Sequence, residues 1–441
     1  MVEKEIIATG NLNGGHIHNY SYGIVSPYCK TDLSTWKTES IEMLETNVEE
    51  QSYETYSYRW VILGLFMLNA IMTQINWITF APIATELEGD LHTTEAFILL
   101  LTASYMIAYV PVNFPATWAL DKYGLKWGTG FGVILTGVFS MVRWLGRSNL
   151  TLLMIGQIMM AIGQPFVLNS FTKVAINWFP EEEKTAAAGL GTVSLLLGVI
   201  IGMIATPLLY ASAGIGTVLL IYGLISFVAM GLYIIFVRNT PPSPPSAEAG
   251  SQAFDFKGFK TLFKNRNFLI LLAMVFIGLG SFNAISTEID SIFTQFSSRT
   301  DASGIIGGVI VIGGIFGAGI LSAISDKIHK RKIFLILAMA VSIPMTWVLP
   351  SIANYTTVLV LAFIFGFFLV SALPIALIFA AEVTYPVSEE ASNGIMMTLG
   401  QVAGLLLLIS FHMYIITILF IVGTLMSFLL EDINQAAPAV A

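Results

Sequence analysis

The sequence predicts an all-α membrane protein with twelve transmembrane helices, arranged as two six-helix pseudo-repeats. The first observation is composition: 56% of the 441 residues are hydrophobic and only 11% are charged, whereas a soluble domain carries about 25% charged residues. The second is that the apolar residues gather in runs of about 20, the length that crosses a bilayer core. Most of the chain must therefore face lipid or other membrane helices.

The apolar runs give the expected helices directly. Their limits are 60–80, 94–118, 127–146, 151–176, 186–211, 215–237, 268–287, 304–323, 333–352, 357–380, 391–411 and 413–430. No acidic or basic residue lies between Glu390 and Glu431. That stretch is too long for one crossing, so we expect a tight hairpin near His412.

The second half of the chain repeats landmarks of the first. An offset of 205 or 206 residues separates three pairs of loop positions, Asp121 and Asp326, Pro180 and Pro386, and Gly189 and Gly394. Internal repeats of this kind are common in secondary transporters, where the solute binds between the halves near the midplane.

Composition along the chain sets the expected domains. Residues 1–58 hold nine acids and three lysines, which favours a disordered acidic tail. Residues 238–267 form a linker that is first Pro-rich and then basic. We therefore expect six-helix bundles at 59–237 and 268–441.

Lysine and arginine in the loops predict the orientation. Counted from a cytosolic N-terminus, the inner loops carry twelve of them and the outer loops and helix ends carry three, Arg143, Arg147 and Arg299. Positive residues favour the cytosolic side. Both termini are expected in the cytosol, and the plasma membrane is the expected location.

Several classes of protein are disfavoured. The single cysteine, Cys29, leaves no intrachain disulfide or cysteine metal cluster. No basic patch interleaves with aromatics, so nucleic-acid binding is unsupported. No nucleophile–base pair indicates an enzyme. We expect no catalytic residues, metal or cofactor, and a monomer whose partners are the lipid bilayer and a small solute.

The segment PATWALDKYGLK, Pro115–Lys126, is a charged hinge between two apolar runs. Its D-K-x-G-x-K pattern resembles the loop motif of the major facilitator superfamily, approximately G-x-x-x-D-[RK]-x-G-[RK]-[RK]. The matching residues are Asp121, Lys122, Gly124 and Lys126. The opening Gly is replaced by Ala116 or Thr117, and Leu125 takes one basic position.

Four longer segments narrow the resemblance. They are YVPVNFPATWALDKYGLK, INWITFAPIA, GQIMMAIGQPFVLNSFTKVAINWFPEEEKTA and AAEVTYPVSEEASNGIMMTLGQVAG. Together they resemble the feline leukaemia virus subgroup C receptor-related solute carriers, in particular the poorly characterised major-facilitator-domain-containing branch. The resemblance implies passive or gradient-driven transport of choline, ethanolamine or similar cations, with haem also proposed in the family.

The resemblance also implies site residues. The family's aromatic wall on helix 1 matches Trp77, and its glutamines on helices 4 and 11 match Gln164 and Gln401. The family's helix 7 tyrosine is replaced by Asn283, with Phe282 beside it. Losing this tyrosine leaves the cation cage incomplete, which puts choline itself in question.

One face of helix 1 is unusually polar. It carries Asn69, Thr73, Asn76, Trp77 and Phe80. Such a face points either at a solute cavity, which would add Thr73 to the binding residues, or at neighbouring helices through hydrogen bonds. From its depth alone, Trp77 is either an interfacial belt residue or an aromatic surface for a cation.

The inner ends of the helices carry the expected gating residues. We expect Asp121, Lys126, Asp326 and Arg331 to hold these ends, with Gly124 breaking the helix. Lys173 is predicted either to pair with Asp121 or Glu382, or to extend to the lipid headgroups.

The positions of the acidic residues indicate whether transport is coupled to protons. Glu288 and Asp290 fall about 30 Å into helix 7 and are expected to form a solvated rim. No Asp or Glu falls securely at mid-membrane, so we expect facilitated diffusion. The alternatives are a proton-coupled permease, a haem exporter, which the absence of a cavity histidine disfavours, and a membrane receptor or sensor that transports nothing.

Overall fold

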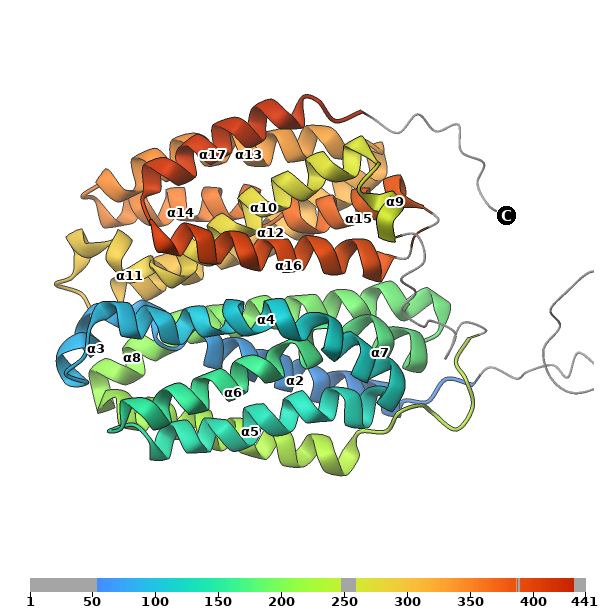
Figure 1. Cartoon of the computed structure of the whole chain (residues 1–441), viewed down its shortest axis with the longest axis horizontal. Coiled ribbons are helices and arrows are strands. Elements are labelled where there is room, and N and C mark those ends of the chain that lie inside the picture. Colours follow the sequence, from blue (N-terminus) through green and yellow to red (C-terminus); the bar gives the residue numbers. More distant parts are fainter. Residues whose placement is uncertain (1–53, 247–258, 386, 388, 432–441) are drawn as a thin grey trace, which may run out of the picture. The chain divides into compact units, whose positions relative to one another are not determined.

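The computed structural model describes residues 54–246, 259–385, 387 and 389–431, and all regular elements among them are helical (Figure 1). In chain order they are α2 Tyr58–Ile78, η1 Ala81–Ile83, α3 Ala84–Asp90, α4 Glu95–Gly124, η2 Leu125–Thr129, α5 Gly130–Leu145, α6 Leu150–Leu168, α7 Phe171–Trp178, α8 Glu181–Phe236, α9 Phe259–Leu262, α10 Arg266–Thr287, α11 Ile289–Ile292, η3 Thr294–Phe296, α12 Ala302–Ile328, α13 Arg331–Val348, η4 Leu349–Ser351, α14 Tyr355–Leu369, α15 Ala372–Thr384, α16 Glu389–Ile409 and α17 Met413–Ser427.

The described residues contain nine helices long and apolar enough to cross a membrane. Two of these, 95–145 and 181–236, turn at glycines with positive φ, Gly124 and Gly214. Counting each as a pair and adding the shorter α17 is consistent with the twelve expected crossings. The hairpin expected at His412 is confirmed, because α16 ends at Ile409 and α17 begins at Met413.

Gly124 shows why the charged hinge turns where it does. Its φ of +71° favours glycine, and an added Cβ would lie 2.7 Å from Oδ1 of Asn239. The same Oδ1 accepts a 2.7 Å hydrogen bond from the backbone N–H of Lys126. Asn239, three residues beyond the end of α8, therefore fixes the turn between α4 and α5.

The helices form two groups, α2–α8 and α9–α17, seen as the lower and upper layers of Figure 1. Across the line between them α8 packs on α12, and α4 packs on α16. We call the end that carries α3 and α11 the outer end, and the opposite end the inner end, following the predicted orientation. The expected domain boundaries stay predictions, since residues 1–53 and 247–258 lie outside the described part.

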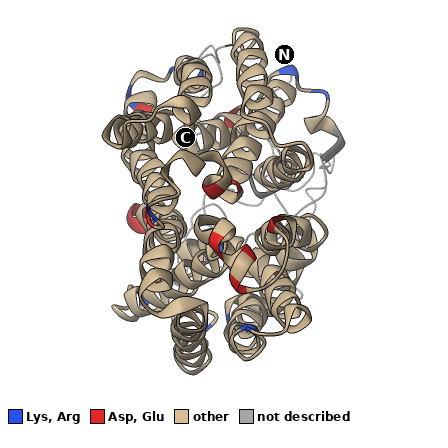
Figure 2. Cartoon of the chain, turned by 90° about the vertical axis from the view of Figure 1, so that its left-hand side faces the viewer, with Lys and Arg blue, Asp and Glu red and all other residues tan. Residues whose placement is uncertain are grey.

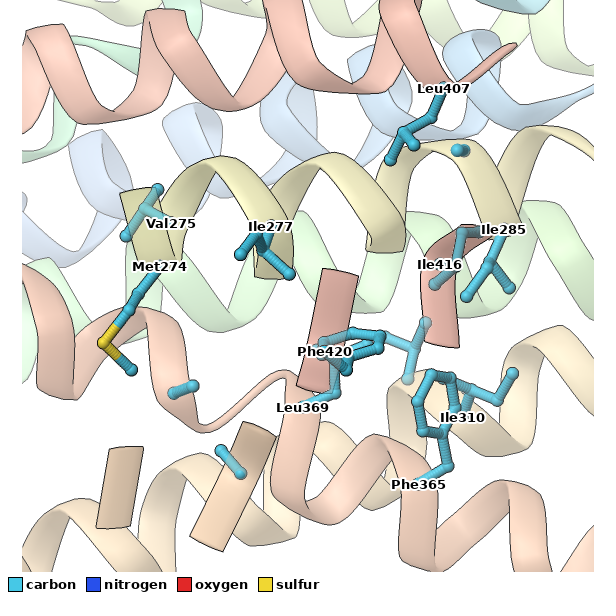
Figure 3. Close-up of a cluster of buried hydrophobic side chains, with 14 of the residues drawn as sticks. Met274, Val275, Ile277, Ile285, Ile310, Phe365, Leu369, Leu407, Ile416 and Phe420 are labelled. Atoms are coloured by element: carbon cyan, nitrogen blue, oxygen red, sulfur yellow. The ribbon is translucent and has the colours of Figure 1, made fainter. Parts of the chain in front are cut away.

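Close backbone approach holds the second group together. A Cβ on Gly366 of α14 would lie 1.7 Å from the carbonyl oxygen of Ile310, and one on Gly317 of α12 would lie 1.8 Å from that of Phe367. Small residues allow such contact where lipid provides no hydrophobic drive between helices. Apolar side chains fill the remaining space, among them Phe365 and Phe420 (Figure 3).

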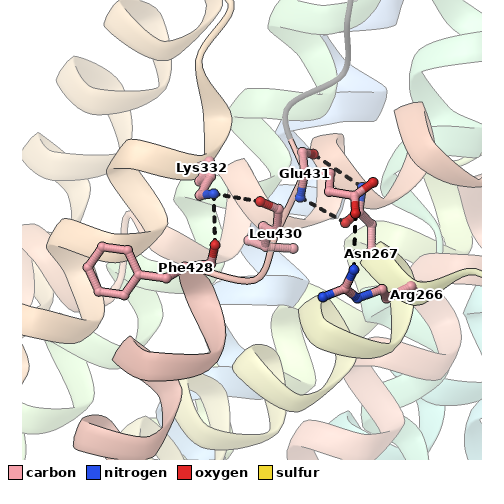
Figure 4. Close-up of polar contacts among 6 residues, drawn as sticks. All are labelled: Arg266, Asn267, Lys332, Phe428, Leu430 and Glu431. Atoms are coloured by element: carbon pink, nitrogen blue, oxygen red, sulfur yellow. Dashed lines mark hydrogen bonds and ion pairs between the residues drawn. The ribbon is translucent and has the colours of Figure 1, made fainter.

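Polar contacts tie the end of α17 to the inner ends of α10 and α13 (Figure 4). Lys332 Nζ donates to the carbonyl oxygens of Phe428 and Leu430 at 2.9 and 2.6 Å. Arg266 pairs with Glu431 at 3.0 Å. The lysine caps carbonyls that a helix end leaves without partners, so the last helix is held where the membrane segment stops.

Candidate functional site

Trp77 lies near the C-terminal end of α2 and is 5% exposed. Its indole Nε1 is buried without a hydrogen-bond partner. Trp60, at the other end of the same helix, is 47% exposed, as expected of a side chain facing lipid or headgroups. Trp77 instead belongs to an apolar cluster that spans both helix groups and includes Tyr105 and Ile289. Its burial argues against the belt interpretation.

Two amide pairs contain the three expected site residues that carry amides, Gln164, Asn283 and Gln401. In the first group, Gln164 Nε2 of α6 donates to Gln74 Oε1 of α2 at 2.9 Å. In the second, Asn283 Nδ2 of α10 donates to Gln401 Oε1 of α16 at 3.1 Å. Each pair satisfies part of its hydrogen-bonding capacity and leaves further donors and acceptors.

The second amide pair borders the line between the two groups. A Cβ on Gly404 of α16 would lie 2.7 Å from Met106 Sδ of α4 and 3.0 Å from Asn283 Cβ. Glycine at this position lets α4 approach the polar pair of the opposite group. Asn283 therefore lies close to the contact between the two groups, and its role in solute binding stays a prediction.

Phe282 faces a different space. It lines an apolar cavity of about 80 Å³ together with Leu196, Leu279, Met339 and Leu369. Neither Trp77 nor either amide pair lines that cavity. The structure therefore separates Phe282 from the polar residues with which the sequence grouped it.

The polar face of α2 points mainly into its own helix group. Asn69 Nδ2 donates to the carbonyl oxygens of Leu65 and Ala229, and Asn76 Nδ2 donates to Ser226 Oγ at 3.0 Å. Thr73 Oγ1 donates to the carbonyl oxygen of Asn69 at 2.8 Å. Interhelical hydrogen bonding accounts for both asparagines, and the binding role of Thr73 stays a prediction.

Arg143 lies in the last turn of α5, at a helix end as the sequence predicts, but its side chain is 0% exposed. Its guanidinium donates to Asn76 Oδ1 at 2.5 Å, to the Asn76 carbonyl oxygen at 3.1 Å and to Gln157 Oε1 at 2.8 Å. Position 143 already fell inside the apolar run 127–146, which was a usable sign of burial.

The outer end joins the two groups through hydrogen bonds. The Asp290 carboxylate accepts from the backbone N–H of Thr85 at 2.9 Å, from the Thr85 hydroxyl, and from Ser303 Oγ at 2.8 Å. Ser303 Oγ also lies 3.2 Å from the carbonyl oxygen of Pro82. We call Thr85, Asp290 and Ser303 the outer latch, because Thr85 and Pro82 belong to the first group and the others to the second.

Glycines let α12 pack closely on α8 beside the latch. A Cβ on Gly304 of α12 would lie 2.2 Å from the carbonyl oxygen of Met203 on α8, and one on Gly308 would lie 2.5 Å from the Ile204 side chain. In this structure the outer end between α8 and α12 is therefore closed.

Glu288 contradicts the predicted solvated rim, because it is 7% exposed. Burial raises the pKa of its carboxyl, a hydrogen bond involving Ser291 lowers that pKa, and the nearby charge of Glu95 raises it. Ser291 Oγ donates to Glu95 Oε1 at 2.6 Å, which joins the two groups. Figure 2, which looks onto this end, shows acidic positions gathered near the line where the groups meet.

The inner ends carry the expected ion pairs. Lys173 Nζ lies 2.8 Å from Asp121 Oδ1, as predicted, and also donates to the carbonyl oxygen of Leu120. In the second group, Arg331 pairs with Asp326 and, at 2.9 Å, with Glu382. The side chain of Lys126 lies over Trp127, 6.0 Å from the ring centre. Whether these residues gate transport stays a prediction.

A polar contact also joins the groups toward the inner end. Asn113 Nδ2 of α4 donates to Thr398 Oγ1 of α16 at 2.9 Å, and Asn169 Nδ2 donates to Asn113 Oδ1 at 2.8 Å. These residues were not singled out from the sequence, although an asparagine inside an apolar run is a usable signal.

The comparisons with known proteins agree with this architecture. The family model described as the Major Facilitator Superfamily matches residues 66–408. The chain belongs to this superfamily. The fold also resembles a solved bacterial homologue of the human lysosomal transporter Spinster in an inward-facing, unoccupied conformation, with a TM-score of 0.57 and 14% identity over 86% of this chain and 95% of that one.

Curated relatives of this superfamily member match most of its length. Solute carrier family 49 member A3 of Xenopus tropicalis is 29% identical over 84% of this chain and 81% of its own. The choline/ethanolamine transporter FLVCR2 of Rattus norvegicus is 28% identical, over 82% and 70% respectively. The choline/ethanolamine transporter FLVCR1 of Felis catus is 30% identical, over 79% and 66%.

Proposed function

We propose that this superfamily member carries a small organic amine, of the choline or ethanolamine kind, across a membrane by facilitated alternating access. The observation that carries the proposal is Trp77, a buried tryptophan whose indole N–H has no partner. An aromatic face attracts an ammonium group most strongly when both are desolvated. The amide oxygens of Gln164 and Gln401 would accept hydrogen bonds from an amine or hydroxyl.

Asn283 distinguishes this proposed site from an aromatic cage. An amide supplies hydrogen bonds but only a small apolar surface. A solute with a polar amine, such as ethanolamine, suits this position better than a trimethylammonium group. We therefore expect ethanolamine to be carried at least as well as choline.

Proton coupling is the second candidate, and Glu288 favours it. This buried carboxyl at the outer end has a pKa raised by burial and by Glu95. A titratable group of this kind can bind and release a proton when the outer end closes and opens.

The proposal extends to orientation and assembly. We propose that both termini face the cytosol of a plasma-membrane protein, on the strength of the lysine and arginine distribution. We also propose a monomeric carrier, whose inner ends are held by the pairs Lys173–Asp121 and Arg331–Glu382.

Uptake of radiolabelled choline and ethanolamine into proteoliposomes tests the function. We expect flux at equal pH on both sides, loss of flux in Trp77→Ala, and retained flux in Trp60→Ala, which changes an exposed tryptophan of the same helix. Flux that appears only with an imposed pH gradient would favour proton coupling. Ligand-dependent stabilisation of the protein without any flux would favour a sensor.

A further inference from the structure

A buried cation lies at the C-terminal end of α2. Arg143 of α5 is completely buried. Among the described residues, none forms an ion pair with its guanidinium. Its bonded partners are neutral groups of Asn76 and Gln157, and the ring of Phe80 lies over it at 5.3 Å. A buried charge with neutral partners is costly, so its position calls for a compensating interaction.

The C-terminal end of α2 compensates the buried charge of Arg143. A helix leaves its last carbonyl groups without backbone partners and carries partial negative charge there. The chain itself ends the helix here, because Pro82 has no N–H to donate to the carbonyl of Ile78. The last turn of α2 contains no basic residue of its own. Arg143 supplies from another helix the cation that this end lacks.

The bonds converge on one peptide unit. The Asn76 carbonyl oxygen accepts from Arg143 at 3.1 Å and from Gln157 Nε2 at 3.2 Å. The Asn76 side chain accepts a second bond from Arg143 and donates to Ser226 of α8. That carbonyl is bonded covalently to the nitrogen of Trp77. Helices α5, α6 and α8 therefore fix the backbone at the tryptophan.

We propose that Arg143 is a positioning residue, which holds the end of α2 so that Trp77 keeps its place in the solute site. The inference rests on the proposed role of Trp77. The fork of the guanidinium is essential, because it binds the carbonyl and the side chain of Asn76 together. Lysine carries the same charge but lacks this planar fork.

Gly156 supports the same assignment. A Cβ there would lie 2.9 Å from Arg143 Cβ and 3.0 Å from its backbone nitrogen. Glycine thus lets α6 approach α5 at the arginine, which brings Gln157, the next residue, within bonding distance. We call Arg143, Asn76 and Gln157 the clamp. The close packing of α6 on α5 at Gly156 allows its hydrogen bonds to form.

The test combines transport with backbone exchange in the full-length protein. In Arg143→Met we expect the KM for ethanolamine or choline to rise at least about tenfold with Vmax reduced less, and Arg143→Lys to be intermediate. The matched control is Arg147→Met, which removes an exposed arginine one turn further along. An unchanged KM in folded Arg143→Met, or an equal change in Arg147→Met, would overturn the proposal.

Hydrogen exchange tests the role of Arg143 independently of which solute the protein carries. In Arg143→Met the amides of residues 77–81 should exchange at least about tenfold faster, while those of residues 60–68 stay unchanged. If the wild type carries neither amine, the proposed function fails, but the exchange rates still show whether Arg143 holds the end of α2. If Arg143→Met does not fold, Gln157→Leu removes one acceptor of Arg143 and one donor to the Asn76 carbonyl. It should raise exchange at residues 77–81 by a smaller factor. No increase there would reject the clamp.

Discussion

Asp290 holds the outer end closed through two hydrogen bonds from Thr85, one of which spans 2.9 Å from the backbone N–H. Because Thr85 is exposed at the rim, we assign each bond about 0.7 kcal/mol, near the low end of the net range for hydrogen bonds. Asp290→Ala removes both bonds, at about 1.4 kcal/mol. We therefore expect the ratio of outer-closed to outer-open protein to fall about tenfold.

Pulsed electron paramagnetic resonance distances measure that ratio. Spin labels at Glu88→Cys and Ser298→Cys, both exposed positions on opposite sides of the latch, would be placed in a Cys29→Ser background. The long-distance population should increase in Asp290→Ala.

The matched control is Asp301→Ala. Asp301 pairs with Arg299 of its own helix group at 3.4 Å, so its loss should leave the distances unchanged. Identical distance distributions for wild type and Asp290→Ala would refute the latch, as would an equal shift in Asp301→Ala.

Three further predictions concern the two ends. The pKa of Glu288 is raised in the outer-closed state, so protonation of Glu288 favours closure. A rise in pH through that pKa should therefore increase the outer-open population, and Glu288→Gln should abolish this pH dependence in the same distance measurement. Gly304→Ala places a Cβ against the Met203 carbonyl, so the outer-open population should rise, and an unchanged population would count against tight closure. Asp121→Ala removes the partner of Lys173 and should slow uptake while changing solute KM less than about twofold; a large KM change would contradict a purely conformational role.

The helices themselves could be predicted from the sequence because crossing a bilayer demands long apolar runs. The same reasoning located the last hairpin, since a membrane helix of twice the needed length must turn. The Lys173–Asp121 pair was also predictable. A lysine inside an apolar segment needs a counter-charge, and the hinge aspartate offered one at the same end.

The partners of the polar side chains could not be predicted in this way. Hydropathy says how deep a residue lies but not which neighbour it faces. Arg143 depends on Asn76, 67 positions away, and Gln74 meets Gln164 across 90 positions. Glu288 was expected in water for the same reason, because the burial of a helix end depends on what packs over it. Tertiary packing decides these contacts.

Solute counterflow tests the central claim most directly. Proteoliposomes loaded with unlabelled ethanolamine and placed in a trace of labelled ethanolamine, at equal pH inside and outside, report exchange by an alternating-access carrier without any coupling ion. The account predicts a transient accumulation of label that Trp77→Ala abolishes and Trp60→Ala retains. Absence of accumulation for both ethanolamine and choline at equal pH, with correctly folded wild-type protein, would contradict it.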